Sequence, residues 1–470
     1  MKKRDWTLGG GRPDGALVSE SCIAQVEKLL RDSKVVFVKK LSRNDRSWSW
    51  GVGGTHQAGV YIPARERDSG FFPPLALKHR ASHEAAIKET FFTSYWPQSG
   101  QTLESRLVHY TSKGEETHLT KLAKGTFAGL APASYLLIGK LIDPGAAPKF
   151  RCVTVEASGD EAKFLEEELS LGPDFSCEII SPSQRTAERK KRQYSFLELV
   201  IKAFFEGRLA EFSRLHATIP KPDQMASKAR AIYCERNNLR SLDPFALSAP
   251  GDVLREISRN VEWELFKDFQ LKARSLQLVE LVVGIGPEVP SIERVITAIV
   301  DGYQEIDALM LSASQQRKSR AGTSFENHID QMLTDGKLPF QKQVVLTDLR
   351  RPDFILPSYR VFTDRHRGKS EALVLSAKTT LRERWKQVPS EIENCELFLA
   401  TVDEQIAGNA VDHMKSLGIT LVVPEKLMKS DVTEYHGHSN VIDFKTFFET
   451  EIRAARMPGW VKQGYCAPIF

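Results

Sequence analysis

The sequence lacks the features that mark membrane, secreted and zinc-binding proteins. No apolar run reaches eighteen residues, so we expect no transmembrane helix. The opening stretch, MKKRDWTLGGGRPDG, contains no apolar signal core. The six cysteines are scattered without a CxxC pair, which favours free thiols in a reducing compartment over a structural zinc site. These absences predict a soluble, cytoplasmic protein.

The composition is that of an ordinary globular protein, with 41% hydrophobic and 27% charged residues. At 470 residues the chain is too long for one hydrophobic core, so two or three domains are expected. A formal net charge of +5 permits a polyanionic partner without requiring one.

The pattern of residues changes twice along the chain. Up to about Ile180, short β-rich segments alternate with turn residues, which predicts a barrel or sandwich. Residues 181–193 are polar and strongly basic, which is typical of a linker. From Tyr194 to about Ser312 helical periodicity dominates, and we expect these helices to form a flank and a dimer surface. Later strands alternate with a helix, which indicates a mixed α/β sheet.

The segment from Asp353 to Lys378 has the pattern of a metal-dependent hydrolytic site. Asp353 precedes a short apolar segment, and a later apolar run ends at Lys378. If the two segments pair as an antiparallel hairpin, Asp353 and Lys378 lie side by side. Phosphodiester hydrolysis uses carboxylates that hold a divalent cation and a positive charge near the developing negative charge. By spacing alone, an ordinary hairpin with two surface charges explains the pattern equally well.

The residues after Lys378 favour a role in DNA recognition. Thr380 followed by Glu383 fits a capping box, so a helix is expected to start here. Its first turn carries Arg382, Glu383 and Arg384. Arginine bonds to guanine and a carboxylate accepts from cytosine N4, so the triplet is suited to reading G and C in the major groove. A solvated charged helix face is the alternative, and the position beside Lys378 favours base reading.

Together these motifs resemble the catalytic core of the EcoRII family of type II restriction endonucleases, within the PD-(D/E)XK nuclease superfamily. In that family the acid two residues before the lysine is missing, and a glutamate thirteen residues after the lysine replaces it. Here Ser376 stands at the first position and Glu391 at the second. Pro389 should kink the helix before Glu391 or begin a new turn.

A second family motif lies upstream, where Ser319-Arg320-Ala321-Gly322 precedes Glu326. The resemblance extends from about Gln315 to Pro424 and implies Mg²⁺ held by Asp353 and Glu391. The catalytic set that it implies is Glu326, Asp353, Lys378 and Glu391.

The N-terminal part is similar to the EcoRII effector domain, a DNA-binding pseudobarrel related to the plant B3 fold. The similarity rests on Lys39–Asp45, on Gly53–Pro63 and on the charged segment Glu104–Thr117. A folded β domain with polar loops is the alternative from composition alone. The DNA contacts that the resemblance implies are Lys40, Arg43, Asn44, His56, Gln57, Tyr61, Arg106, Lys113 and Glu115.

The resemblance also implies an activity and an organisation. Residues 1–180 would form the effector pseudobarrel, 181–193 the basic linker and 194–470 the restriction-endonuclease-like α/β domain with its helical flank. The enzyme would be a homodimer that cuts double-stranded DNA at a CC/GG site, CCWGG, on the 5′ side of the first C. Its effector domain would inhibit the nuclease until it binds a second site, and a cytosine methyltransferase would accompany the enzyme without binding it.

Family members with an interrupted site turn central nucleotides out of the duplex into pockets lined by an aromatic side chain and an arginine. Arg230 and Tyr233 are candidates for this pocket. Two other readings stay open. One is a DNA-binding regulator with a degenerate nuclease domain, which the intact Asp353, Lys378 and Glu391 disfavour. The other is a nuclease for structured or damaged DNA, which the Arg-Glu-Arg triplet disfavours.

Overall fold

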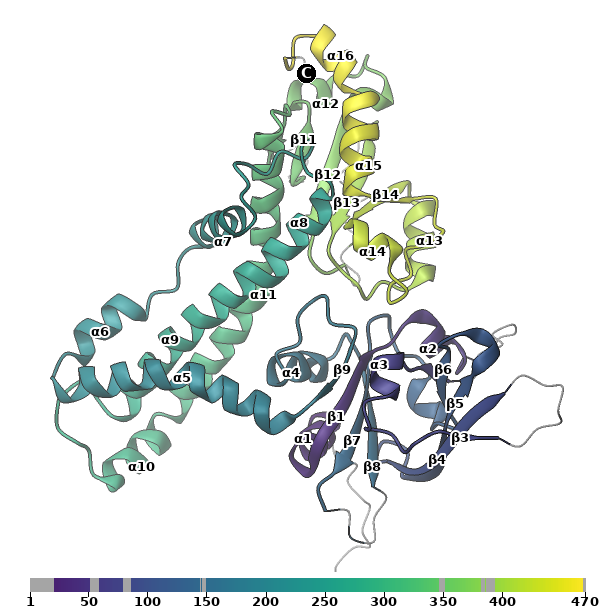
Figure 1. Cartoon of the computed structure of the whole chain (residues 1–470). Coiled ribbons are helices and arrows are strands. Elements are labelled where there is room, and N and C mark those ends of the chain that lie inside the picture. The colour runs from purple at the N-terminus through teal and green to yellow at the C-terminus, as the bar shows by residue number, and fades with distance from the viewer. Residues whose placement is uncertain are drawn as a thin grey trace, which may run out of the picture.

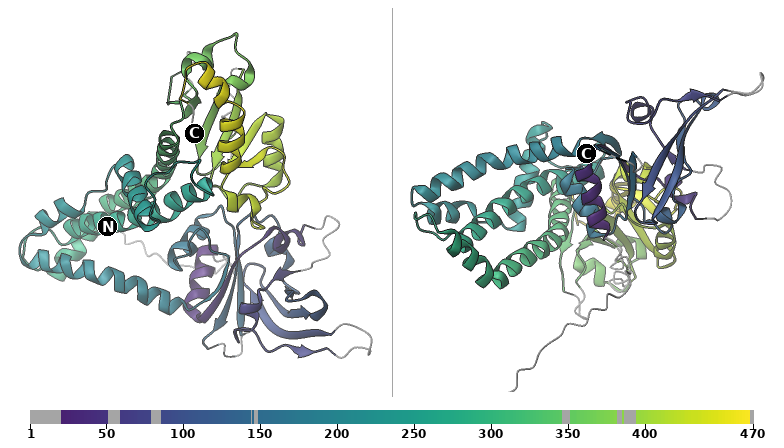
Figure 2. Two further views of the ribbon diagram at one scale, coloured as in Figure 1. Left: turned by 45° about the horizontal axis from the view of Figure 1, so that its top comes forward. Right: turned by 90° about the horizontal axis from the view of Figure 1, so that it is seen from below.

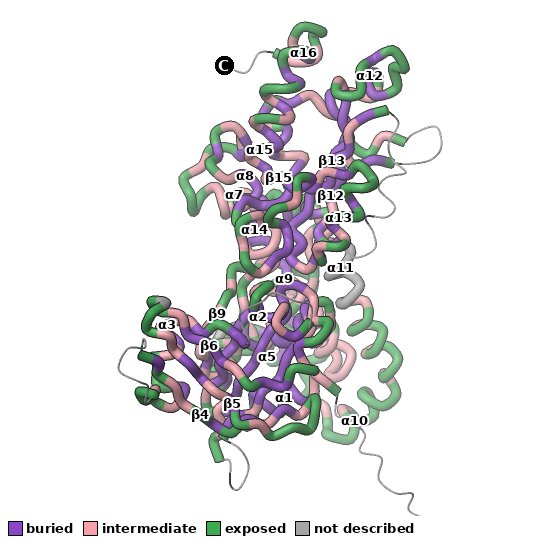
Figure 3. Tube along the Cα trace, turned by 90° about the vertical axis from the view of Figure 1, so that its right-hand side faces the viewer, coloured by how far each residue is buried: buried purple, intermediate pink, exposed green. Residues whose placement is uncertain are grey.

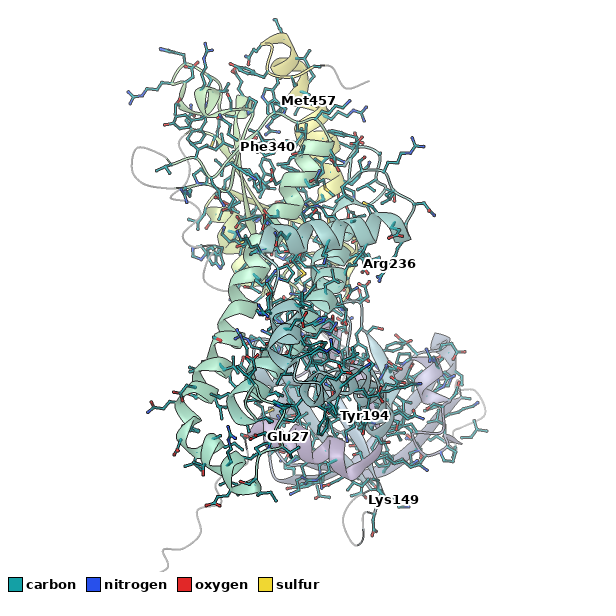
Figure 4. All side chains as sticks on the ribbon, turned by 90° about the vertical axis from the view of Figure 1, so that its left-hand side faces the viewer. Glu27, Lys149, Tyr194, Arg236, Phe340 and Met457 are labelled. Atoms are coloured by element: carbon teal, nitrogen blue, oxygen red, sulfur yellow. The ribbon has the colours of Figure 1, made fainter. Side chains whose placement is uncertain are left out.

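The computed structural model describes residues 21–50, 59–78, 86–143, 145, 149–345, 351–381, 385 and 394–467. It contains two β-sheets and a group of long helices, so the chain is of the mixed α/β class. Figure 1 shows the N-terminal sheet below the C-terminal sheet, with the long helices extending to one side of both. In Figure 4, Phe340 and Met457 lie at the C-terminal sheet end, and Glu27 and Lys149 lie at the opposite end.

The N-terminal sheet has nine strands and is strongly curled (Figure 2). Eight strands follow the order β2-β6-β5-β4-β8-β7-β1-β9, and β3 pairs with β4. Successive side chains of a strand point to opposite faces. In β1, Phe37 therefore joins one hydrophobic cluster, and Val36 and Val38 join another. The strands are β1 Ser33–Lys40, β2 Val60–Tyr61, β3 Ala76–Leu77, β4 Ile87–Trp96, β5 Gln101–Tyr110, β6 Thr117–Thr120, β7 Tyr135–Leu141, β8 Phe150–Val155 and β9 Cys177–Ile180.

Helix α1 covers the second of these clusters. Its Val26, Leu29 and Leu30 are buried there, and Ser21 caps its first turn by accepting a hydrogen bond from Ala24 N. The short strands confirm the β-rich pattern expected before Ile180. The helical elements of this part are α1 Cys22–Asp32, α2 Arg43–Ser47, α3 Ala64–Arg67 and α4 Asp160–Glu168, with 3₁₀ turns η1 Thr111–Lys113 and η2 Lys124–Phe127.

The C-terminal sheet has six strands in the order β10-β11-β12-β13-β14-β15. The first three strands are antiparallel, and β12 to β15 are parallel. Both faces are covered, because Phe354 and Leu356 belong to one core cluster and Ile355 belongs to the other. The strands are β10 Gln341–Lys342, β11 Phe354–Leu356, β12 Leu373–Lys378, β13 Glu396–Thr401, β14 Ile419–Val423 and β15 Val441–Asp443.

Short helices surround this sheet and follow its strands (Figure 1). The described cysteines, six in all, are free, as the sequence predicts. Among the described residues, no helix is both long and apolar enough to cross a membrane. The helical elements are α12 Tyr359–Thr363, η4 Lys369–Glu371, α13 Gly408–Ser416, α14 Glu425–Lys429, α15 Phe444–Thr446, the π-helix η6 Phe447–Ala454 and α16 Met457–Lys462.

The helices between the sheets confirm the helical periodicity expected after Tyr194. Five of them, α5, α6, α9, α10 and α11, form a projection that we call the helical arm (Figures 1 and 2). A π-helix, η3, continues α8 into α9. The bounds are α5 Pro182–Phe205, α6 Leu209–His216, α7 Pro222–Arg236, α8 Pro250–Glu256, η3 Ile257–Val261, α9 Glu262–Val282, α10 Ile292–Asp301 and α11 Tyr303–Asp335.

The basic segment expected to be a linker forms the first half of α5. Arg185 pairs with Glu178 at 3.3 Å, and Arg189 pairs with Glu168 at 2.5 Å, so this half is held against the N-terminal part. The second half buries Val200 in a small core of the arm. A helix can connect two domains as a loop can, so the domain boundary at 181–193 stays a prediction.

Candidate active site at the edge of the C-terminal sheet

The structure brings Asp353 and Lys378 together. Strand β11 starts directly after Asp353 and pairs antiparallel with β12, with Phe354 opposite Leu375. The end of β12 therefore lies beside the start of β11. The Lys378 Nζ donates to Asp353 Oδ2 at 2.6 Å, and Ala377 N donates to the same oxygen at 2.8 Å.

Glu326 approaches this pair from helix α11. Burial raises the pKa of the Glu326 carboxyl above its usual range, and the negative charge of Asp353 adds to this effect. Lys378 and a 3.4 Å hydrogen bond from Gln343 Nε2 act in the opposite direction. Two carboxylates and one ammonium group thus share the edge of the sheet. A cation bound there would offset the repulsion between the two carboxylates.

Of the predicted catalytic set, the structure describes Glu326, Asp353 and Lys378. Glu391 and Pro389 lie outside the described residues. Ser376 is buried in β12, two residues before Lys378. No group of three or more His, Cys, Asp or Glu side chains that could hold a metal ion occurs within the described ranges. Asp353 and Glu326 are chemically suited to a hard divalent cation, because carboxylate oxygens are its preferred ligands.

Arg382, Glu383 and Arg384 also lie outside the described residues. The residues on either side of this triplet are buried and anchored. Leu381 N donates to Asp403 Oδ2 at 2.7 Å. The Trp385 ring packs edge-on against His413, with 5.0 Å between ring centroids.

A cavity opens next to the end of β12. Its wall includes Thr379 and Thr380, the π-helix η3, the first turn of α9 and helix α11. Short π-helical segments inside longer helices often mark functional sites. The lining residues are Ser258, Arg259, Glu262, Trp263, Phe266, Arg320, Ser324, Thr379 and Thr380.

Arg320, from the second family motif, is unusual in this wall. Its Nη1 donates to Pro220 O at 2.9 Å, and its guanidinium carbon lies 4.9 Å from the centre of the Phe266 ring. Its Nε and Nη2 are buried without a hydrogen-bond partner among the described residues. Trp263 stacks on Phe266. The wall therefore offers aromatic faces, hydrogen-bond donors and, at Glu262, a carboxylate.

The sequence predicts none of these residues as part of a pocket and gives Arg230 and Tyr233 instead. Arg230 donates to Asn327 O at 3.2 Å and lies 3.4 Å from His328 Nδ1. Tyr233 packs against the core of the C-terminal sheet. Neither residue lines the cavity described above. The available signal was the spacing of Arg259 and Trp263, four residues apart and so on one face of a helix.

The residues expected to contact DNA from the N-terminal part differ in how far they are exposed. Lys40 is buried and pairs with Glu404 of the C-terminal part at 3.0 Å. Arg43, Asn44, Tyr61 and Glu115 are exposed. Arg106 is half-buried and pairs with Glu89, Lys113 lies in the 3₁₀ turn η1, and His56 and Gln57 lie outside the described residues.

Comparisons with known proteins identify several that this chain is similar to. Residues 289–448 match the family model of the EcoRII C-terminal domain. The chain is 25% identical over 406 residues to the type II restriction enzyme EcoRII of Escherichia coli, covering 84% of this chain and 88% of that one. It is 24% identical over 247 residues to the type II restriction enzyme SsoII of Shigella sonnei, covering 48% and 75%. A similar solved structure is metal-depleted Ecl18kI in complex with uncleaved, modified DNA, with 20% identity, a TM-score of 0.44 and coverage of 57% and 86%.

Proposed function

We propose that this chain, a member of the EcoRII family of type II restriction enzymes, cuts double-stranded DNA at CCWGG on the 5′ side of the first C. The observation that carries the proposal is the contact between Asp353 and Lys378, with Glu326 beside them. Asp353 and Glu391 would hold Mg²⁺, with Glu326 close by. When bound, Mg²⁺ polarises the phosphate and lowers the pKa of a water molecule.

Lys378 has a separate role in the proposed site. Its ammonium group lies at the end of β12, where it can approach the oxygens of the scissile phosphate as negative charge develops on them. The 2.6 Å contact with Asp353 holds the ammonium group at the same edge as the carboxylates. Because the charge is fixed in advance by the sheet, little reorganisation is needed during the reaction.

Two elements would read the sequence. Arg382, Glu383 and Arg384 would contact the outer G and C bases, as their chemistry allows. The cavity beside Thr379 would receive a central base turned out of the duplex. Its aromatic side chain Trp263 can stack on a base. Arg320 and Glu262 can then bond to the edge of that base, and this makes the cavity a better candidate for the pocket than Arg230 and Tyr233.

The N-terminal part would act as the effector domain, a B3-like pseudobarrel that inhibits the nuclease until it binds a second site. Its contacts support this proposal, because they lie at the carboxyl ends of the parallel strands, where Lys378 also lies. Lys40 pairs with Glu404 after β13, and Arg46 pairs with Glu434 after β14 at 3.1 Å. A domain held at this edge restricts the approach of DNA to Lys378.

Two copies of the chain would assemble through the helical arm. Most of the exposed large hydrophobic side chains of the described residues lie on the arm, between Tyr194 and Leu311. Ile292, Ile296 and Ile299 form one stripe on α10, which has no buried residue (Figure 3). A monomer rarely leaves an apolar patch larger than about 300–600 Å² uncovered. A homodimer would cover the stripe and place one catalytic set on each DNA strand.

The test is digestion of plasmids that carry no, one or two CCWGG sites, with Mg²⁺ and with EDTA, followed by sequencing of the DNA ends. We expect Mg²⁺-dependent cutting only at the site, with ends that start at the first C. Specific binding without cutting would instead indicate a regulator with a degenerate nuclease. Cutting without sequence preference would indicate a nuclease for structured or damaged DNA.

A further inference from the structure

Two neighbouring carboxylates, Asp403 and Glu404, are buried near the proposed site and have no part in the proposed chemistry. They follow β13, which runs parallel to β12 with Thr401 paired to Lys378. The loop that carries them therefore begins beside the catalytic lysine. Carboxylates are rarely buried unless they are paired or accept hydrogen bonds, so the partners of these two residues indicate what they do.

Asp403 holds the start of the segment that carries the proposed base-reading triplet. Its Oδ2 accepts a hydrogen bond from Leu381 N at 2.7 Å, and its Oδ1 accepts one from Gln405 N at 2.9 Å. Its own N–H donates to Thr401 Oγ1 at 3.1 Å, and its carbonyl accepts from the Tyr435 hydroxyl. Both carboxylate oxygens and both backbone groups are thus used. Leu381 is the last described residue before Arg382.

Glu404 joins the same loop to the N-terminal part. Its Oε2 lies 3.0 Å from Lys40 Nζ, at the end of β1, and its Oε1 lies 2.5 Å from Arg255 Nη2, in α8. Burial alone would raise the pKa of Glu404, but the positive charges of Lys40, Arg255 and Arg259 outweigh it and hold the pKa at about 2. Arg259 also lines the cavity beside Thr379.

Further contacts link the two parts around this pair. Lys40 Nζ and Arg255 Nη2 both donate to Pro173 O, and Arg255 also pairs with Asp174. Gln405 Nε2 donates to Ala157 O at 2.9 Å. The N-terminal part therefore contacts the loop at Glu404 and at Gln405, next to the carboxylate that holds Leu381.

We propose that Asp403 is a positioning residue for the segment after Lys378, and that Glu404 makes its position depend on whether the N-terminal part is docked. The proposal rests on the proposed function, and deepens it by naming the link between effector and recognition segment. When the N-terminal part undocks, Lys40 moves away from Glu404, and the loop loses a contact next to Asp403. The Asp403 carboxylate can then shift, and the hydrogen bond that it accepts from Leu381 N changes its geometry.

A purely structural role is the competing explanation. A buried ion pair adds little net stability, because removing two charges from water costs about as much as their attraction returns. If Glu404 serves packing alone, its replacement would change thermal stability without changing how the enzyme responds to DNA. Activity readouts that compare two DNA substrates separate the two explanations.

The first variant is Asp403→Asn. Asparagine keeps the volume but offers one acceptor oxygen, so it cannot accept from both Leu381 N and Gln405 N. We expect the ratio of kcat/KM for CCWGG to that for a site with one changed base to fall roughly tenfold. Amide exchange at Leu381 should become faster. The control is Asp412→Asn, which removes an exposed carboxylate paired with His438 at 3.0 Å and should change neither readout.

The second variant is Glu404→Gln, measured on a one-site plasmid with and without an added CCWGG duplex. We expect a higher cleavage rate without the duplex, and the duplex should raise this rate by less than about twofold. The ion pair between Lys40 and Glu404 is already absent in this variant, so binding of the duplex has no such contact to break. Lys40→Met should reproduce this result from the other side of the contact. If Glu404→Gln lowers the melting temperature, stimulation by the duplex is also measured in the Lys40→Met/Glu404→Gln double variant. Because coupled residues give non-additive effects, the double variant should show no greater loss of stimulation than either single variant.

Each part of the proposal has its own contrary result. Unchanged discrimination and unchanged exchange at Leu381 in Asp403→Asn would overturn the positioning role. Normal stimulation in both Glu404→Gln and Lys40→Met would overturn the link to the N-terminal part. A wild-type protein that does not cut CCWGG would refute the proposed function itself, and amide exchange at Leu381 would still test the hydrogen bond that Leu381 N donates to Asp403.

Discussion

Replacing Lys378 with methionine tests the proposed chemistry most directly. Methionine keeps most of the length of the side chain and removes its charge. The remaining carboxylates, Asp353 and Glu326, then face each other without the ammonium group that Asp353 contacts at 2.6 Å. Loss of a fixed charge beside the reacting phosphate lowers the rate by about 10²–10³. We therefore expect at least about a hundredfold loss in the single-turnover rate.

The effect on stability should be much smaller. The Lys378 and Asp353 side chains are 25% and 13% exposed, so the pair is partly screened by water. Such pairs contribute about 1 kcal/mol or less, and a change of this size shifts the melting temperature by roughly 2–4 °C in a domain of this size. A hundredfold loss of rate with so small a shift cannot come from unfolding.

The assay is single-turnover cleavage of a CCWGG duplex, with melting temperature and duplex affinity measured on the same preparations. Lys342→Met is the matched control, because Lys342 also lies in this sheet and pairs with Asp330. It should cut at nearly the wild-type rate. A Lys378→Met rate within about fivefold of wild type, with normal affinity, would contradict the assignment of Lys378 as a group that stabilises the transition state.

Three further predictions concern the cavity, the helical arm and the core. A duplex with 2-aminopurine at the central position should fluoresce more strongly on binding, and Trp263→Ala should remove most of this increase; an unchanged increase would place the extruded base elsewhere. Ile296→Glu should convert a dimer into a monomer in light scattering, since it puts a charge in the centre of the α10 stripe, whereas Arg294→Glu on the same helix should not. Burial lowers the pKa of His328 despite its contact with Glu262, so only the unfolded chain takes up the proton below pH about 6.5, and stability should fall by up to about 1.4 kcal/mol per pH unit as the pH drops. In denaturant titrations from pH 7.5 to 5.5, His328→Asn should show a smaller slope, and an equal slope would assign the acid sensitivity to other groups.

The contact between Asp353 and Lys378 could be predicted because it depends on local geometry. One hairpin joins the two residues, and antiparallel pairing fixes which ends meet. The cavity residues could not be predicted in this way. Arg259 and Arg320 are separated by α9, α10 and much of α11, and only the packing of these helices brings them to one wall. Periodicity identifies the helices but does not give their packing partners.

The contact between Lys40 and Glu404 is another example of this limit. It joins residues 364 positions apart, and the sequence offers no local signal for it. The resemblance to the effector domain implies that Lys40 contacts DNA, whereas the structure buries it against Glu404. The helix at 182–193 is a different case, because Ala, Glu, Arg, Lys and Gln are all strong helix formers. The basic charge of this segment is typical of a linker, but its helix propensity determines the structure that it adopts.

The continuity of α5 sets a limit on how far the two parts of the molecule can travel. A helix of 24 residues is about 36 Å long. Unlike a flexible loop, it keeps a fixed distance between its ends and transmits rotation from one end to the other. The N-terminal part, once undocked, would swing on an arc of fixed radius about the arm. Two DNA sites could then be held together only at certain separations and helical phases. Cleavage of two-site plasmids would rise and fall with the number of base pairs between the sites, with a period close to one turn of the double helix.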